Sequence, residues 1–186
     1  MRVISGTARG TILHSIESIN TRPTLDRVKE SLFNIISNKI NEDTVALDLF
    51  AGSGAIGIEL LSRGAKEVVF CDMSKDAVNM INQNLKKTRL EFNAEVVNQD
   101  YKKALKYLKS RDYRFDIIYI DPPYKNNFAI DAIKNIAEYD LLNKDGIIVV
   151  ETDDKERELK EIESNNIKYK LSDLRKYGRA YLLFLS

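Results

Sequence analysis

Short apolar runs of strand length alternate with helical patterns through most of this chain, and this alternation limits the folds that are open to it. Continuously apolar strands separated by helices are typical of a parallel sheet with helices on both faces. Ligands of such sheets bind at the carboxyl ends of the strands, where the strand order reverses. The expected strands are Val45–Phe50, Glu67–Asp72, Ala94–Asn98, Phe115–Ile120 and Ile147–Glu151, and the expected helices lie near 54–63, 74–89, 101–110, 127–140 and 153–164.

The N-terminal part departs from this alternation. Arg2–Ser5 and Thr11–Ser15 are expected to pair as a β-hairpin. Thr24 is a candidate cap for a helix whose apolar residues follow helical spacing. We therefore expect an extension of hairpin and helix over residues 1–40 and the main domain over residues 41–186.

The C-terminal part also departs from it. Ile167–Leu171 and Arg179–Leu185 are joined through Tyr177–Gly178 without a long helix, so we expect these two strands to be antiparallel. Together with the runs above, they predict an α/β fold with a seven-stranded, mostly parallel sheet whose last strand is antiparallel.

Composition excludes several other classes of protein. The chain has 186 residues, of which 44% are hydrophobic, which is enough for one globular domain with a real core. Its single Cys excludes a disulfide scaffold and a cysteine-based zinc site, and we expect no metal. The N-terminus lacks the apolar segment of an export signal and the longest apolar runs are strand-sized, so we expect a cytoplasmic protein without a membrane span.

A glycine-rich loop follows the first long apolar strand. Gly52, Gly54 and Gly57 satisfy the dinucleotide-binding pattern G-x-G-x-x-G, and Asp72 ends the next strand 20 residues after Gly52. Such glycines allow close approach to a ligand, and a carboxylate at that strand end can bind a ribose. An NAD-dependent oxidoreductase is therefore one candidate, and a tight turn without a ligand is another.

A carboxylate inside the preceding strand favours a different cofactor. Asp48 lies near the end of that strand, where burial is costly unless the carboxylate binds loop amides or a polar ligand. It would repel a pyrophosphate but attract a ligand with an ammonium group. The D-x-F-x-G-x-G arrangement of Asp48, Phe50, Gly52 and Gly54 resembles motif I of the class I S-adenosylmethionine-dependent methyltransferases, which have a Rossmann-like fold.

This resemblance implies a set of cofactor contacts. Asp72 would bind the ribose, although an Asp there can instead cap the helix that starts at Met73–Ser74. Asp100 would accept a hydrogen bond from the adenine amino group, with Tyr101 beside it. The other expected contacts are Phe50, Ala51, Gly52, Ser53, Gly54 and Met73.

The tetrapeptide Asp121-Pro122-Pro123-Tyr124 ends another buried strand. Two consecutive prolines fix φ and remove two donors, so this segment is rigid and cannot continue the sheet. The carboxylate of Asp121 and the carbonyl of Pro122 can accept both hydrogens of an exocyclic amine. Asp121 can then take the leaving proton. Asp121 is also an expected cofactor contact. Tyr124 can stack on the base, which must be unpaired or flipped to reach such a pocket.

Other interpretations of this tetrapeptide stay open. A Pro-Pro turn that simply stops the strand is one alternative. The pattern is that of motif IV of amino-methyltransferases, and it does not choose between adenine N6 and guanine N2, or between DNA and RNA. Cytosine-C5 transfer needs a cysteine nucleophile and is disfavoured, because Cys71 is expected to pack as a small core residue.

Longer stretches narrow this choice. Four stretches closely resemble the RsmD-type bacterial 16S ribosomal RNA guanine-N2 methyltransferases. They are M-R-V-I-S-G-T-A-R-G, T-R-P-T-L-D-R-V-K-E-S-L-F-N-I-I, L-D-L-F-A-G-S-G-A-I-G-I-E-L-L-S-R-G-A and D-P-P-Y. The resemblance spans nearly the whole chain and is weakest over 153–170. It implies methylation of one guanine, with S-adenosylmethionine as the cofactor, in 16S rRNA of the small ribosomal subunit or its assembly intermediate. A monomer is expected.

The resemblance also implies contacts outside the core motifs. Thr21, Arg22 and Pro23 would close over the methionine end of the cofactor, with Arg22 near its carboxylate. The expected RNA contacts are Arg2, Arg9, Arg27 and Lys125, and His14 is expected on the surface. The alternative is that the arginines are ordinary exposed charges, at a helix start for Arg22 and Arg27 and in a hairpin for Arg2 and Arg9.

The distribution of charge bears on the partner. The net charge of +1 argues at first against nucleic acid, but residues 102–114 carry six Lys/Arg against one Asp/Glu, and residues 151–164 carry three against seven. Such segregation can give a basic face beside an acidic one, so we expect weak, salt-sensitive binding to naked RNA. The alternatives that remain are an adenine-N6 methyltransferase acting on DNA or RNA, an NAD oxidoreductase and a non-catalytic RNA-binding subunit.

Overall fold

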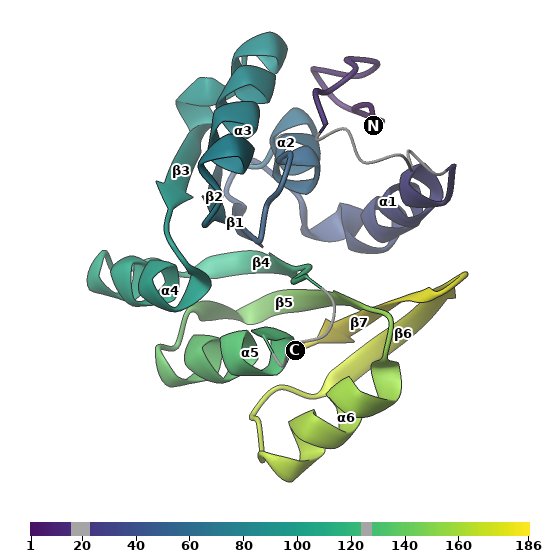
Figure 1. Ribbon diagram of the computed structural model, residues 1–186, viewed down its shortest axis with the longest axis vertical. Helices are drawn as coiled ribbons and strands as arrows, with labels where there is room; N and C mark the ends of the chain where they lie inside the picture. The colour runs from purple at the N-terminus through teal and green to yellow at the C-terminus, as the bar shows by residue number, and fades with distance from the viewer. Residues whose placement is uncertain (16–22, 124–127) are drawn as a thin grey trace.

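The computed structural model describes residues 1–15, 23–123 and 128–186, with the side chains of 23–26 left out. Its helices are α1 (Pro23–Ile36), α2 (Ala55–Ser62), α3 (Lys75–Thr88), α4 (Tyr101–Ser110), α5 (Phe128–Glu138) and α6 (Lys155–Ser164). Its strands are β1 (Val45–Leu49), β2 (Glu67–Asp72), β3 (Ala94–Asn98), β4 (Phe115–Ile120), β5 (Leu142–Thr152), β6 (Leu171–Tyr177) and β7 (Ala180–Leu185). Short 3-10 helices cover Ser37–Lys39 and Glu91–Asn93. The predicted alternation of strands and helices is confirmed (Figure 1), although β5 starts at Leu142 rather than at Ile147.

The strands form one seven-stranded sheet in the order β3-β2-β1-β4-β5-β7-β6. The strands from β3 to β5 in this order pair in parallel, whereas β7 is antiparallel to both β5 and β6. The predicted mostly parallel sheet with an antiparallel last strand is therefore confirmed. The strand order reverses between β1 and β4, which is where a sheet of this kind binds its ligand.

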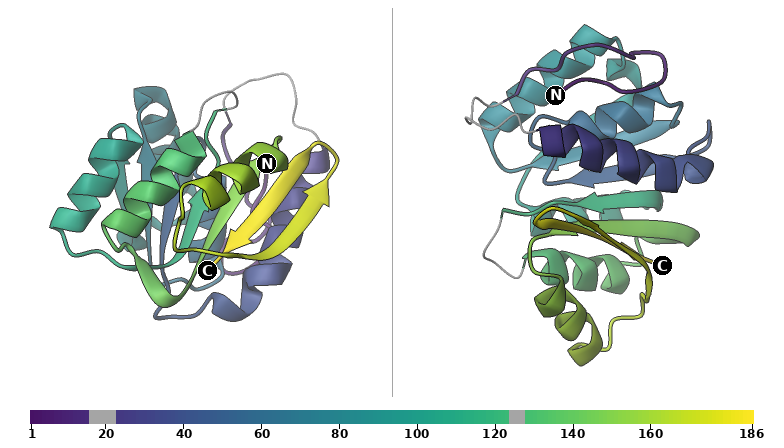
Figure 2. Two further views of the ribbon diagram at one scale, coloured as in Figure 1. Left: turned by 90° about the horizontal axis from the view of Figure 1, so that it is seen from below. Right: turned by 90° about the vertical axis from the view of Figure 1, so that its right-hand side faces the viewer.

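Each central strand sends alternate side chains into two separate apolar cores. In β4, Ile117 packs with residues of α1, α2 and α3, whereas Ile118 packs with residues of α4, α5 and α6. Figure 2 shows these two helical layers on opposite faces of the sheet. Burial on both faces explains why the strands are apolar throughout rather than at every second residue.

The N-terminal segment pairs with itself over a short distance and is also held by side chains of α2. Arg2 and Ile12 form an antiparallel bridge, flanked by backbone hydrogen bonds from the NH of Val3 to the oxygen of Thr11 and from the NH of Leu13 to the oxygen of Met1, both 3.0 Å. The predicted pairing is therefore confirmed, although it is limited to this one bridge and does not extend over two full strands. The backbone NH groups of Ile4 and Ser5 donate to the carboxylate of Glu59, at 2.8 and 2.9 Å. These donors are therefore not available to a hairpin ladder.

Asn84 of α3 fastens the other end of this segment. Its Nδ2 donates to the backbone oxygens of His14 and Ser53, at 3.0 and 2.9 Å, and its Oδ1 accepts from the His14 NH at 2.7 Å. Asn84 is fully buried, and one side chain thus links the N-terminal segment, α3 and the glycine-rich loop. Val3 of the segment shares a core with α1 and the sheet, and the division at residue 40 stays a prediction.

The C-terminal hairpin lies later in the chain than expected. The strand predicted over Ile167–Leu171 is wrong, because the NH of Ile167 donates to the oxygen of Ile162 at 3.3 Å and belongs to the turn that ends α6. The turn between β6 and β7 is at Gly178, with φ of +62°, as predicted.

Among the helices that the structure describes, none combines the length and the apolar character needed to cross a bilayer.

Candidate active site

The glycine-rich loop connects β1 to α2 through left-handed backbone conformations. Phe50, Gly52 and Gly54 have φ of +74°, +56° and +76°, values that a side chain disfavours and glycine tolerates. The NH groups of Phe50 and Ala51 both donate to the oxygen of Cys71 in β2, at 3.0 and 2.9 Å. The loop is therefore anchored to the neighbouring strand and leaves its outer side open to a ligand.

Asp48 lies beneath this loop in β1. It is 2% exposed, and its Oδ2 accepts a hydrogen bond of 2.9 Å from the NH of Gly57. A Cβ at Gly57 would lie 2.2 Å from the ring of Phe70, so glycine is needed for this close approach of α2 to the sheet. Burial, together with the charge of Asp72, raises the pKa of Asp48 to about 7. The buried carboxylate thus has a backbone amide partner, although this amide lies in the first turn of α2 rather than in the loop.

Asp72 connects the loop to the start of α3. Its Oδ2 accepts from the NH of Gly52 at 2.9 Å, and its Oδ1 accepts from the NH of Ser74 at 2.9 Å. The residue that caps α3 is Ser74, whose Oγ accepts from the NH of Ala77 at 3.3 Å. The capping role that the sequence left open for Asp72 thus belongs to Ser74.

A cavity of about 510 Å³ lies along the carboxyl ends of β2 and β3. Asp72 lines it together with Asp100, which caps α4 by accepting from two backbone NH groups at 3.1 and 3.2 Å. Phe50, Tyr101 and Phe128 form an aromatic wall, with successive ring centroids 5.3 and 5.5 Å apart. The remaining lining residues are Cys71, Met73, Gln99, Lys102, Asp121 and Pro123. An aromatic wall with carboxylates beside it suits a nucleoside.

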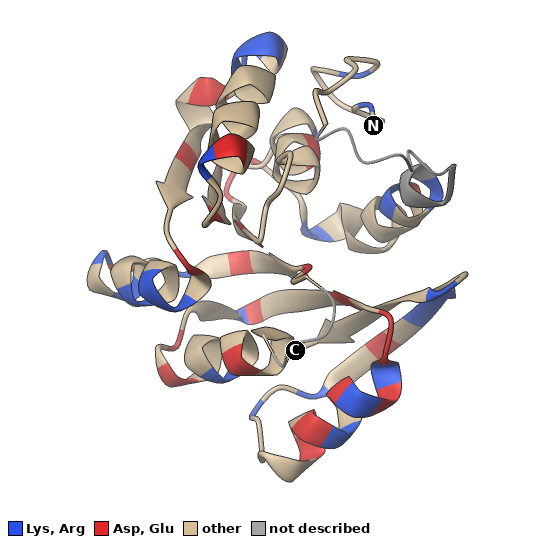
Figure 3. Ribbon diagram, in the orientation of Figure 1, with Lys and Arg blue, Asp and Glu red and all other residues tan. Residues whose placement is uncertain are grey.

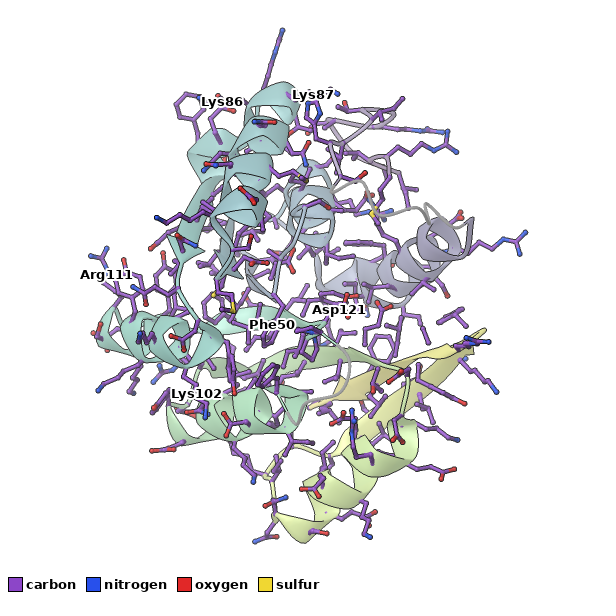
Figure 4. All side chains as sticks on the ribbon, viewed as in Figure 1. Phe50, Lys86, Lys87, Lys102, Arg111 and Asp121 are labelled. Carbon is purple, nitrogen blue, oxygen red and sulfur yellow. The ribbon has the colours of Figure 1, made fainter. Side chains whose placement is uncertain are left out.

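A second cavity, of about 190 Å³, lies on the other side of the loop, between β1, β4 and α1. Asp121 and Phe50 line both cavities and therefore mark their junction. Figure 4 labels these two side chains, which lie close together near the middle of the molecule. The other lining residues of the smaller cavity are Met1, Val28, Lys29, Leu32, Asp48, Ala51, Gly52, Ser53, Ala55, Ile56, Tyr119 and Glu151.

The smaller cavity is strongly acidic. Burial and the charges of Glu151 and Asp48 raise the pKa of Asp121 well above its ordinary value. Burial also raises the pKa of Glu151, although the hydroxyl of Tyr119 donates to this carboxylate at 2.5 Å. Three carboxyl groups in one small cavity favour a cationic ligand, because its positive charge stabilises their ionised forms.

Sequence reasoning missed Tyr119, Glu151 and Lys29 as site residues. Two of them had a signal: Tyr119 lies two residues before Asp121 and shares its face of β4, and Glu151 ends the expected strand next to β4. Lys29 takes a buried position of α1, and its Nζ lies 2.9 Å from Glu59. Its partner Glu59 comes from another helix, so the spacing of residues in the sequence could not identify Lys29 as a site residue.

The exposure of the other residues named from the sequence is as follows. Cys71 is buried, and burial raises the pKa of its thiol to about 12, which confirms the predicted packing role. Met73, Pro123, Arg2, Arg9, Arg27 and His14 are exposed, and Pro122 is buried. Thr21, Arg22, Tyr124 and Lys125 lie outside the described residues, and Pro23 begins α1 without a described side chain.

Two cavities that meet beneath a glycine-rich loop, at the switch point of a seven-stranded sheet with an antiparallel last strand, define a class I S-adenosylmethionine-dependent methyltransferase. The chain belongs to the RsmD family: a family model described as "Conserved hypothetical protein 95" matches residues 1–186. Its cofactor is S-adenosylmethionine.

Individual relatives agree with this assignment. YlbH of Bacillus subtilis is 43% identical, over 82% of this chain and 83% of its own length. Ribosomal RNA small subunit methyltransferase D of Haemophilus influenzae is 40% identical, over 82% of this chain and 79% of its own. The solved structure of a hypothetical protein from Thermus thermophilus superposes with a TM-score of 0.81 at 26% identity, covering 100% of this chain and 99% of that one.

Proposed function

We propose that this methyltransferase transfers a methyl group from S-adenosylmethionine to the N2 amine of one guanine in 16S rRNA. The observation that carries the proposal is the position of Asp121, which lines both cavities at their junction. A substrate amine held by Asp121 would then face the point where the two halves of the cofactor meet. The family relatives named as small-subunit rRNA methyltransferases support the choice of RNA and subunit.

The cofactor would lie across both cavities. The larger one would take adenosine, with the Asp72 carboxylate toward the ribose and Asp100 and Tyr101 near the base. The smaller one would take the methionine part, with its ammonium toward Asp48 and the backbone of Gly52–Gly54 around it. Thr21, Arg22 and Pro23 remain proposed contacts of the methionine end, as the family resemblance implies.

The bound cofactor supplies an electrophilic methyl group on a sulfonium. Asp121 and the carbonyl of Pro122 would accept the two hydrogens of the amine, which turns the nitrogen lone pair toward the junction of the cavities. Asp121, whose pKa is raised, would then take the proton that the amine loses. Tyr124 would stack on the guanine. Alignment of the amine nitrogen with the methyl group would account for most of the rate enhancement, because an in-line methyl transfer needs little covalent help from the protein.

The substrate is proposed to be the RNA within the small ribosomal subunit or its assembly intermediate, and the enzyme to act as a monomer. A cytoplasmic location follows from this substrate. Arg2, Arg9, Arg27 and Lys125 remain proposed RNA contacts; the first three are exposed on the described surface. An RNA held in a folded particle presents a shape as well as a charge, which suits an enzyme with a net charge of only +1.

Transfer of labelled methyl groups tests the proposal directly. Small subunits from bacteria that lack the enzyme are incubated with the protein and labelled S-adenosylmethionine, and the RNA is digested to nucleosides. N2-methylguanosine is the expected product. N6-methyladenosine would favour the adenine alternative, and unlabelled RNA would contradict the proposed function altogether.

The affinity for S-adenosylmethionine is expected to rise with pH up to about 7, the pKa of Asp48. Below that value Asp48 is protonated, and a cationic ligand must displace the proton, so affinity should rise by about tenfold per pH unit at most for this one group. Asp121 and Glu151, whose pKa values are also raised, line the same cavity with Lys29 and Tyr119, and the charge of Asp72 acts on Asp48 from the larger cavity.

Calorimetric titration at several pH values checks this expectation. S-adenosylhomocysteine, which lacks the sulfonium charge but keeps the ammonium group, is the matched ligand and should show the same dependence on the titration of Asp48. Asp48→Asn should flatten the profile. A cofactor affinity that does not change between pH 5.5 and 8 would contradict the assigned role of Asp48.

A further inference from the structure

We propose that the exposed face of α4 guides RNA phosphates toward the catalytic pocket, an inference that rests on the proposed RNA substrate. Lys102, Lys106 and Lys109 are spaced i, i+4 and i+7, so they lie along one side of the helix, and all three are exposed. Arg111 continues this row just beyond the last residue of α4. Figure 3 shows the basic residues along α4, and Figure 4 labels Lys102 and Arg111 near its two ends. We call these four residues the α4 row.

The α4 row begins at the pocket itself. Lys102 lines the larger cavity together with Asp121 and Pro123. Its ammonium lies 3.0 Å from Asp131, but the two side chains are 60% and 37% exposed. Such an exposed ion pair contributes little, so Lys102 can exchange this carboxylate for a phosphate at low cost. The row therefore starts at the rim of the cavity that Asp121, the proposed partner of the substrate amine, also lines.

The rest of the α4 row carries positive charge that no described carboxylate contacts directly, although Asp140 is close enough to Lys109 to feel its charge. Lys103 pairs with Asp100 at 3.5 Å, and Arg114 pairs with Asp140 at 3.5 Å. Within the described part of the chain, Lys106, Lys109 and Arg111 form no ion pair. Cations held in a row without partners attract a polyanion, because binding releases its condensed counterions.

A single RNA strand fits this row better than an acidic protein does. The strand carries one phosphate per nucleotide at regular intervals, and its bases can unstack beside the pocket. The apolar side of α4, by contrast, is buried against the sheet through Ala104, Leu105 and Leu108, so it offers nothing to a protein partner. The expected contact is thus made by charge and should depend steeply on salt.

The test compares two variants that lose the same charge. One is Lys106→Gln, Lys109→Gln, Arg111→Gln. The control is Lys66→Gln, Lys86→Gln, Lys87→Gln, which removes three exposed lysines, two of them from α3 on the opposite face of the sheet. Binding to small subunits and to naked 16S rRNA transcripts is measured from 50 to 300 mM salt, and cofactor affinity is measured in parallel.

The variant of the α4 row is expected to bind RNA about tenfold more weakly at 150 mM salt, with a slope of log affinity against log salt that is lower by about 2. Its cofactor affinity should match that of the parent, and the control should keep the parent slope. Equal losses in both variants, or none in the first, would overturn the proposal. Methyl transfer by the parent protein is recorded in the same samples, so a failure of the proposed function appears separately, as absent N2-methylguanosine.

Discussion

Asp121→Ala is expected to lower methyl transfer by about 10²- to 10⁴-fold, the usual contribution of a positioned proton acceptor. The variant loses both an acceptor for the substrate amine and the group that takes its proton. Asp121 lines the junction of the two cavities but is only one of several residues around each, so the affinity for S-adenosylmethionine should change little. Single-turnover transfer and calorimetry measure the two quantities separately.

Two further variants sharpen this test. Asp121→Asn keeps an oxygen acceptor but cannot take a proton, so activity between that of the parent and that of Asp121→Ala would separate positioning from proton transfer. Asp153→Ala removes an exposed carboxylate outside both cavities and should leave transfer unchanged. Undiminished turnover of Asp121→Ala would refute the role assigned to this residue.

Glu59→Gln is expected to lower the free energy of unfolding by about 3–5 kcal/mol, as is usual when one partner of a buried ion pair is removed. Glu59 is fully buried, and Lys29 and Arg63 approach its two oxygens at 2.9 and 2.8 Å. Burial opposes its charge, but the hydrogen bond from Ile4 and the charge of Lys29 hold the pKa of Glu59 below its usual value. Urea unfolding followed by circular dichroism measures the change.

A double variant provides the control for this prediction. Lys29→Met together with Glu59→Gln removes both charges, so it should be less destabilised than the sum of the two single variants. Strict additivity would show that the ion pair is not the source of the effect. A loss below about 1 kcal/mol for Glu59→Gln alone would show that water replaces the carboxylate.

The carboxylates of the site could be predicted from the sequence because each lies at or near the end of an apolar strand. Asp48, Asp72 and Asp121 come from three neighbouring strands of a parallel sheet, whose carboxyl ends share one edge. Their convergence is therefore fixed by topology, and topology follows from the alternation of strands and helices. The same argument would have found Glu151, which lies one residue before the end of the adjacent β5.

The support of the N-terminal segment could not be predicted in this way. Glu59 lies in the apolar sequence of α2, and nothing near it in the sequence identifies Ile4, Ser5 or Lys29 as its partners. These contacts depend on where the segment crosses α2, which local patterns do not encode. The reversal of the chain was predictable from its turn residues, but the hydrogen bonds from the backbone of Ile4 and Ser5 to the side chain of Glu59 were not.

The link through Asn84 has a consequence for the order in which this protein is made. The N-terminal segment is synthesised first, yet its partners Glu59, Ser62 and Asn84 lie 54 to 70 residues further along the chain. It can dock only after most of α3 has left the ribosome, so contacts of long sequence separation complete the loop that surrounds the cofactor. This segment thus takes its native place only after residues far beyond it in the chain have been made.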